Sequence, residues 1–246
     1  MNLSKNEVVF LKRIIFNGQI KTMIPLKDTI KSARFPVMNW IIIMLNFTVF
    51  IFELLMNPEQ TEAFFDKFGL IPATTSIFGN TNYTFLTNMF LHGGWLHFLG
   101  NMWMLYIFGD NVEDRMGSFR YLVFYLLSGI MASLCHYVLY INSMIPALGA
   151  SGAISGVMAA YMFLFPKSRI ISLVPVFFLP LFIPIPAFIF IGIWFFVQFF
   201  NGTFHLLFSN TATGIAFWAH IGGFLAGLIF YKFFVKRKYK KKKKGK

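Results

Sequence analysis

The sequence predicts an all-α membrane protein, a bundle of six transmembrane helices with both chain termini on the cytoplasmic side. Of its 246 residues, 57% are hydrophobic and 13% are charged, whereas a soluble domain carries about 25% charged residues. Several apolar runs are long enough to cross a bilayer core of about 30 Å, which takes about 20 helical residues. Basic residues gather on one side of these runs, as the positive-inside rule requires of cytoplasmic segments.

The individual spans follow from hydropathy and from helix breakers. A basic amphipathic arm, residues 1–35, comes first; because it is polar, we expect no cleavable signal peptide. The apolar run after Arg169 contains four prolines, which disfavour a helix, so the fifth span is expected only from Ala187. The predicted spans are residues 36–56, 86–108, 119–141, 149–165, 187–200 and 211–231. They form a membrane domain over residues 36–235, followed by a disordered polybasic cytoplasmic tail over residues 236–246.

Charge gives the orientation. Six spans place both termini on one side, and that side receives the arm, the tail and four basic residues at or between the ends of spans: Arg115, Arg120, Lys167 and Arg169. The net charge of +13 is therefore expected to set topology and to contact anionic lipid headgroups, and not to bind nucleic acid. The opposite side receives loop 57–85, which is long for a connector and suggests local structure or a function. The single Cys135 supports neither a disulfide nor a metal cluster.

Polar groups at membrane depth are costly, so each is a candidate for function. The second span carries His92, His97 and Asn101, the fourth begins GASGAISG around Ser151, and the sixth contains AHIGGFLAG around His220. With a rise of 1.5 Å per residue, Ser151, His220 and His97 share a level roughly 10 Å below the outer surface.

These groups suit serine hydrolysis without a metal or cofactor. His220 can take the proton of Ser151, and backbone N–H groups at the start of the fourth span can bind an oxyanion. His97 and Asn101 are i,i+4 neighbours that can donate to the same oxyanion. No acidic residue is evident near His220, so we infer a dyad. Glycines allow the fourth and sixth spans to pack closely, although helix packing alone would also explain them: Gly152, Gly156, Gly223 and Gly227.

The three motifs together resemble a rhomboid protease. They are His92-x4-His97-x3-Asn101, Gly149-x-Ser151-Gly152-x3-Gly156 and Ala219-His220-x2-Gly223-x3-Gly227, and the resemblance covers residues 36–235. It implies a six-helix rhomboid-like core in which a Ser–His dyad cleaves transmembrane substrates near the outer face. It implies Ser151 as nucleophile, His220 as base, and an oxyanion site with these members: His97, Asn101, Gly149 and the backbone of Ser151.

The resemblance also assigns supporting roles. Glu113 and Arg115 resemble the family's Glu-x-Arg structural bracket, and His92 is expected to brace the loop between the first two spans. Loop 57–85 is implied to be partly membrane-embedded, and the fifth span with outer loop 201–210 is implied to gate the substrate. Many relatives carry an aromatic residue four positions after the nucleophile, beneath the base; here that position is Ser155. The orientation of His220 is therefore left to the tertiary structure.

Two other functions fit parts of the sequence. A catalytically silent rhomboid-like protein that binds membrane clients would leave Ser151 unreactive toward serine-directed probes. A transporter or metal channel using the histidines predicts repeated halves and charged residues along a path, neither of which is evident. The protease is favoured, with transmembrane proteins as substrates. A short basic arm favours the bacterial plasma membrane.

Overall fold

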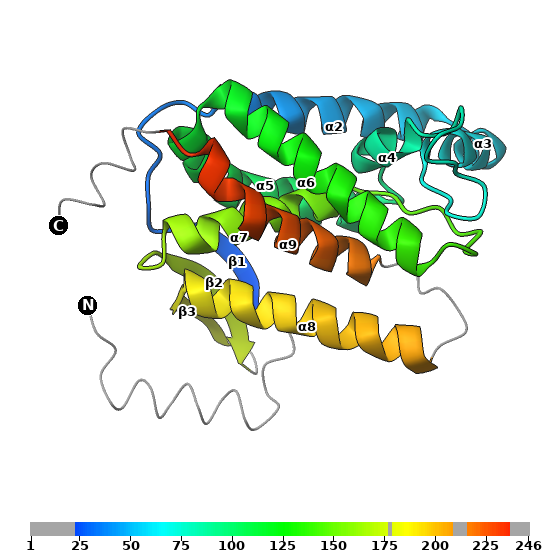
Figure 1. Cartoon of the computed structure of the whole chain (residues 1–246). Helices are drawn as coiled ribbons and strands as arrows, with labels where there is room; N and C mark the ends of the chain where they lie inside the picture. The colour runs from blue at the N-terminus through cyan, green and yellow to red at the C-terminus, as the bar shows by residue number, and fades with distance from the viewer. Residues whose placement is uncertain (1–22, 177–178, 209–215, 237–246) are drawn as a thin grey trace.

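Helices make up most of the protein, and three short strands lie beside them (Figure 1). The computed structural model describes residues 23–176, 179–208 and 216–236. Residues 1–22 of the predicted arm and 237–246 of the predicted tail lie outside this range, as do residues 209–215 between the fifth and sixth spans. The helices are α2 (Val37–Leu55), α3 (Pro58–Phe68), α4 (Thr84–Thr87), the 3-10 turn η1 (Asn88–Phe90), α5 (Trp95–Met116), α6 (Ser118–Leu139), α7 (Ser151–Leu164), α8 (Ala187–Phe208) and α9 (Phe217–Phe234).

Four of the described helices are long and apolar enough to cross a membrane: α2, α6, α8 and α9. Helix α7 is apolar but has only 14 residues. Helix α5 has 22 residues, and its last two turns carry the charged groups of Asp110, Glu113, Asp114 and Arg115. The number of six spans and the cytoplasmic position of both termini therefore stay predictions.

The predicted start of the second span is wrong. Residues 86–94 form short turns and a loop, and the long helix begins only at Trp95 and continues to Met116. Gly94, with φ of 152°, adopts a backbone conformation that residues with a side chain rarely take, so the helix cannot extend backward through it. Helix α8, in contrast, continues past the predicted end at residue 200 as far as Phe208.

The expectation of an all-helical chain is also wrong, because β1 (Ile24–Asp28), β2 (Arg169–Val176) and β3 (Leu179–Pro186) form an antiparallel sheet in the order β1-β2-β3. The end of the predicted arm is thus a strand. The inference that prolines prevent a spanning helix before Ala187 is confirmed. Four prolines lie in this hairpin, three of them on the edge strand β3, where a missing N–H is tolerated: Pro175, Pro180, Pro184 and Pro186.

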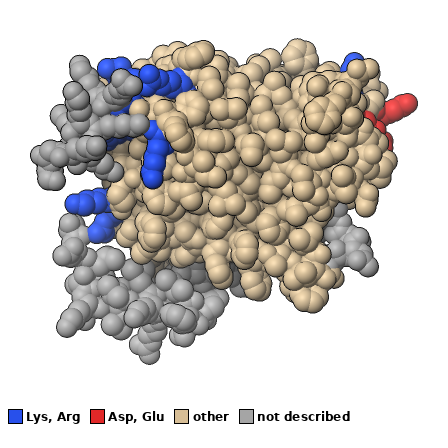
Figure 2. Space-filling view, viewed as in Figure 1, with Lys and Arg blue, Asp and Glu red and all other residues tan. Residues whose placement is uncertain are grey.

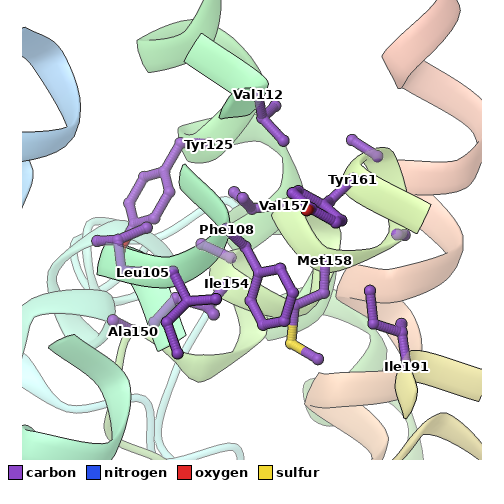
Figure 3. Packing of buried hydrophobic residues seen from close by; sticks show 14 of the residues in the cluster. Leu105, Phe108, Val112, Tyr125, Ala150, Ile154, Val157, Met158, Tyr161 and Ile191 are labelled. Atoms are coloured by element: carbon purple, nitrogen blue, oxygen red, sulfur yellow. The ribbon is translucent and has the colours of Figure 1, made fainter. Parts of the chain in front are cut away.

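Helix α7 lies at the centre of the bundle, and α8 lies at its margin (Figure 1). Eleven of the 14 residues of α7 are buried, which explains how so short a helix is held inside the molecule. Its side chains interlock with those of α5 in a core seen in Figure 3, where Ile154, Met158 and Tyr161 face Leu105 and Phe108. Only four of the 22 residues of α8 are buried, the smallest buried share among the long helices.

Charged groups gather at the two ends of the molecule. On the face shown in Figure 2, most Lys and Arg atoms lie at one end, Asp and Glu lie at the other end beside a small basic patch, and the middle shows no charged residue. The acidic end is α3 in loop 57–85, whose exposed face carries Glu59, Glu62 and Asp66. The expectation of local structure in this loop is confirmed, since a capping box between Asn57 and Gln60 starts α3.

At the basic end, Glu113 joins three helices. Its carboxylate accepts the backbone N–H groups of Met38 at 3.1 Å and Asn39 at 2.8 Å, and the hydroxyl of Ser118 at 2.5 Å. The first turn of α2 has no cap of its own, so the carboxylate of α5 caps it. The Arg115 guanidinium lies 4.7 Å from the ring centre of Phe165, just after α7. These contacts hold the ends of α5 and α7 together at the basic end, and Ser151 therefore lies toward the opposite end.

Candidate active site

Ser151 and His220 meet although 69 residues separate them. The hydroxyl Oγ of Ser151 and Nε2 of His220 are 2.7 Å apart, which is hydrogen-bond distance. Ser151 is the first residue of α7, and His220 lies in the first turn of α9. Both side chains are half-buried, so the pair is held by the fold and is still partly accessible.

Glycines bring α7 and α9 close enough for this bond. A Cβ on Gly223 would overlap the carbonyl of Gly152 and would lie 2.6 Å from the hydroxyl of Ser155. A Cβ on Gly227 would overlap the backbone of Gly156. Neither position can therefore accept a side chain without parting the helices, and the packing role predicted for these glycines follows from the backbone contacts.

His97 and Asn101 of α5 face the turn that precedes the serine. A Cβ on Gly149, where φ is 119°, would lie 2.5 Å from Nε2 of His97 and 3.5 Å from Nδ2 of Asn101. Asn101 is buried, and its Nδ2 finds no hydrogen-bond partner within the described part of the chain. A buried amide donor without a partner is costly, so its position beside the Ser151 turn is typical of a donor kept for a ligand.

The start of α7 offers further donors. The first N–H groups of a helix have no partner inside it, and here they belong to Ser151 and the residues that follow. The preceding turn is tied down, because the N–H of Gly149 donates to the carbonyl of Asn88 at 2.8 Å. Ala147 and Leu70 exchange two backbone hydrogen bonds, which dock loop 57–85 onto the same segment.

A small cavity of about 20 Å³ lies beside Ser151, lined mainly by apolar residues and by a few polar ones; its volume is enough for one water molecule. The amide of Asn88 donates to the hydroxyl of Ser133 at 3.0 Å on its wall, and His136 lines it from α6. None of these three residues was predicted from the sequence. The hydrogen bond between Asn88 and Ser133 joins positions 45 residues apart, which no local pattern reveals.

His92 lies beside the site and does not contact Ser151 or His220 in any recorded hydrogen bond. Its backbone N–H donates to the Glu53 carboxylate of α2 at 3.0 Å, and its buried ring lies edge-on to that of His97 with centres 5.2 Å apart. This contact joins α2 to the loop before α5, the place where a brace is expected. Within the residues that the structure describes, no three His, Cys, Asp or Glu side chains converge as metal ligands.

Helix α8 contributes two residues that sequence reasoning missed. Oε1 of Gln198 lies 2.9 Å from Nδ1 of His220, and the ring of Trp194 lies beside the imidazole with centres 5.8 Å apart. Gln198 is the one amide side chain in the apolar run 187–200. Like Asn101, Gln198 is a polar group in an apolar run, which is a local sign of function.

The sequence is similar to one protein family and to several individual proteins. A family model described as the rhomboid domain matches residues 79–237. The putative rhomboid protease YdcA of Bacillus subtilis is 34% identical over 83 residues, 32% of this chain and 39% of that protein. RHOMBOID-like protein 6, mitochondrial, of Arabidopsis thaliana is 34% identical over 97 residues, 39% of this chain and 31% of that protein.

A longer alignment is found with the presenilin-associated rhomboid-like protein, mitochondrial, of Bos taurus, which is 29% identical over 136 residues, 54% of this chain and 34% of that protein. The chain spans about a third of the length of these relatives. Because the family model matches well over half of the 246 residues and includes both Ser151 and His220, the chain belongs to the rhomboid family.

Proposed function

We propose that this protein is an intramembrane serine endopeptidase that cleaves membrane-spanning proteins through a dyad of Ser151 and His220. The observation that carries the proposal is the 2.7 Å contact between the serine hydroxyl and the imidazole, at a helix start that faces an unpaired buried amide. A serine is a weak nucleophile until a base in hydrogen-bond reach takes its proton. The same arrangement has no evident use in a packing role, since both side chains stay partly accessible.

In the first step, Oγ of Ser151 forms a bond to the carbonyl carbon of the scissile peptide while its proton passes to Nε2 of His220. The carbonyl oxygen becomes an oxyanion beside the turn at Gly149. There it accepts hydrogen bonds from the free N–H groups at the start of α7 and from the side chains of His97 and Asn101. One such donor is typically worth about 10²- to 10³-fold in kcat.

In the second step, the carbon–nitrogen bond breaks, and the imidazolium gives its proton to the departing amine. Water then attacks the acyl-serine, His220 accepts a proton from it, and that proton returns to Ser151 as the new carboxyl group leaves. Water at this depth needs polar partners, and the small cavity beside the serine, where Ser133 and His136 are among the lining residues, has room for one water molecule.

The substrate class follows from where the dyad lies. Helices long and apolar enough to cross a membrane surround α7, and Ser151 is at the end of α7 away from the basic end of the molecule. With the basic end in the cytoplasm, cleavage would occur near the outer face. The names of relatives include mitochondrial and chloroplastic proteins, so the bacterial plasma membrane stays a prediction.

The test uses the full chain, purified in detergent, with a transmembrane reporter and a serine-directed fluorophosphonate. Wild type should cleave the reporter and be labelled at Ser151, and both signals should vanish in S151A. H220A should lose cleavage and label far more slowly. S76A, which changes an exposed loop serine, is the matched control and should behave like wild type. A folded wild-type protein without cleavage or labelling would refute the proposal and support the client-binding alternative.

A further inference from the structure

We infer that Gln198 of α8 is a positioning residue for the base, which holds His220 in the tautomer and orientation that the reaction needs. This inference rests on the proposed function and goes beyond it, because a dyad as such contains no third group. Gln198 contacts neither the nucleophile nor the peptide in the proposed mechanism. It would act only through His220.

The tautomer follows from the two hydrogen bonds of the imidazole. To take the proton of Ser151, Nε2 must accept, so the ring hydrogen must be on Nδ1. That hydrogen points to Oε1 of Gln198 at 2.9 Å, and an amide oxygen is purely an acceptor. The opposite tautomer would place two acceptors, Nδ1 and Oε1, against each other. In the orientation that the structure shows, with Oε1 facing Nδ1, the Gln198 amide pairs with the tautomer that leaves Nε2 free to accept.

A neutral amide suits this position better than a carboxylate. Helices α7, α8 and α9 contain no Asp or Glu, and an ionised group at membrane depth is expensive. The amide can fix the ring through one hydrogen bond without a buried charge. It stabilises the imidazolium less than a carboxylate would, so its effect is expected to be mainly on orientation.

Trp194 supports the same ring from the same helix. It is one turn before Gln198, so both side chains project from one face of α8, and its ring lies 5.8 Å from that of His220 at an interplanar angle of 37°. Ser155, at the position where relatives carry an aromatic residue, instead donates its hydroxyl to the carbonyl of Gly152 at 2.6 Å. A larger side chain there would meet the close approach at Gly223. The aromatic neighbour of the base therefore comes from α8 in place of α7.

This arrangement connects the base to the long helix with the smallest buried share. Half of the residues of α8 are exposed, and near the end of α8 the indole N–H of Trp218 in α9 donates to the carbonyl of Gly202 at 3.0 Å. If α8 moves outward to admit a substrate, the Gln198 contact must break and then form again before the base is aligned. Closure of α8 and activation of His220 would then be the same event.

The experiment compares Q198L, Q198E and V197L in the reporter assay, with kcat, KM, the pH profile and the rate of fluorophosphonate labelling as readouts. Q198L keeps the side-chain volume and removes the acceptor; we expect kcat to fall about 10- to 100-fold, the lower part of the range for acid–base catalysis. KM and the melting temperature should stay near wild type, and labelling of Ser151 should slow in parallel with kcat. V197L, at an exposed neighbour, should match wild type.

Q198E restores the acceptor and adds a negative charge, so kcat should recover and the acidic limb of the pH–rate profile should move to higher pH. The other titratable groups that act on His220 are His97 of α5 and His136 of α6, and they are unchanged in this comparison. An active wild type with Q198L indistinguishable from it would overturn the inference and leave the dyad intact. A wild type that neither cleaves nor labels would overturn both.

Discussion

Replacement of Gly223 by alanine tests the contact between α7 and α9 on which the dyad depends. The new Cβ would overlap the carbonyl of Gly152 and lie 2.6 Å from the hydroxyl of Ser155. Restoring an ordinary van der Waals distance from that carbonyl requires the helices to part by about 1.5 Å. The 2.7 Å contact between Ser151 and His220 would then lengthen to about 4 Å, which is no longer a hydrogen bond.

The G223A substitution is expected to affect two quantities, the stability of the fold and kcat. Overpacking of a close helix contact costs about 1–3 kcal/mol, partly offset by the better helix propensity of alanine, worth about 1 kcal/mol. The net loss of stability should therefore be about 0–2 kcal/mol, which leaves the protein folded. Loss of the base from hydrogen-bond reach should lower kcat about 10²- to 10⁴-fold, so G223A is expected to be a folded and almost inactive protein.

The assay measures reporter cleavage, labelling of Ser151 and thermal unfolding in the same detergent. G192A is the matched control, because a Cβ on Gly192 meets nothing within 4 Å, and it should keep wild-type cleavage. Wild-type labelling and cleavage by G223A would refute the reasoning, since the helices would then accommodate the methyl group without moving the dyad. Equal loss in G192A would point to a general effect of glycine removal in membrane helices.

Three further predictions concern single residues. N101A should lower kcat about 10²- to 10³-fold through loss of one oxyanion donor, with little change in thermal stability; an unchanged kcat would exclude this role. E113A should destabilise the fold by about 2–4 kcal/mol, because the first turn of α2 loses its acceptor, and a wild-type melting temperature would contradict it. Burial raises the pKa of Asp28 above its ordinary value of 3.8, so this carboxyl favours folding at low pH and disfavours it as the pH rises through the raised value. D28N should remove that slope, and melting temperatures of both proteins from pH 4 to pH 8 would show it; parallel curves would contradict it.

Much of the site could be predicted from the sequence because its signals are local. A polar residue in an apolar run is costly at membrane depth, so it can be recognised as a candidate from its own segment. This applies to Ser151, His220, His97 and Asn101. The prolines after Arg169 exclude a helix by their own geometry. Glycine spacing likewise indicates which helix faces can approach closely.

The rest depends on contacts between distant segments. The pairing of β1 with β2 joins residues near 24–28 to residues near 170–173, and neither strand shows a partner in its own sequence. The start of α5 at Trp95 depends on the left-handed backbone of Gly94, which a hydropathy window passes over. The cavity behind Ser151 needs Asn88 and Ser133 to meet across two helices.

The orientation of His220 shows most clearly which features follow from the sequence and which depend on the tertiary structure. The sequence by itself predicted that a histidine and a serine share one depth in the membrane, since hydropathy and helix rise depend only on the order of residues. Only the tertiary structure decided that Gln198 and Trp194 of α8 hold the imidazole, because that contact depends on how one helix rotates and packs against another. Rotation is set by the sum of many side-chain contacts, and no stretch of the chain encodes it alone.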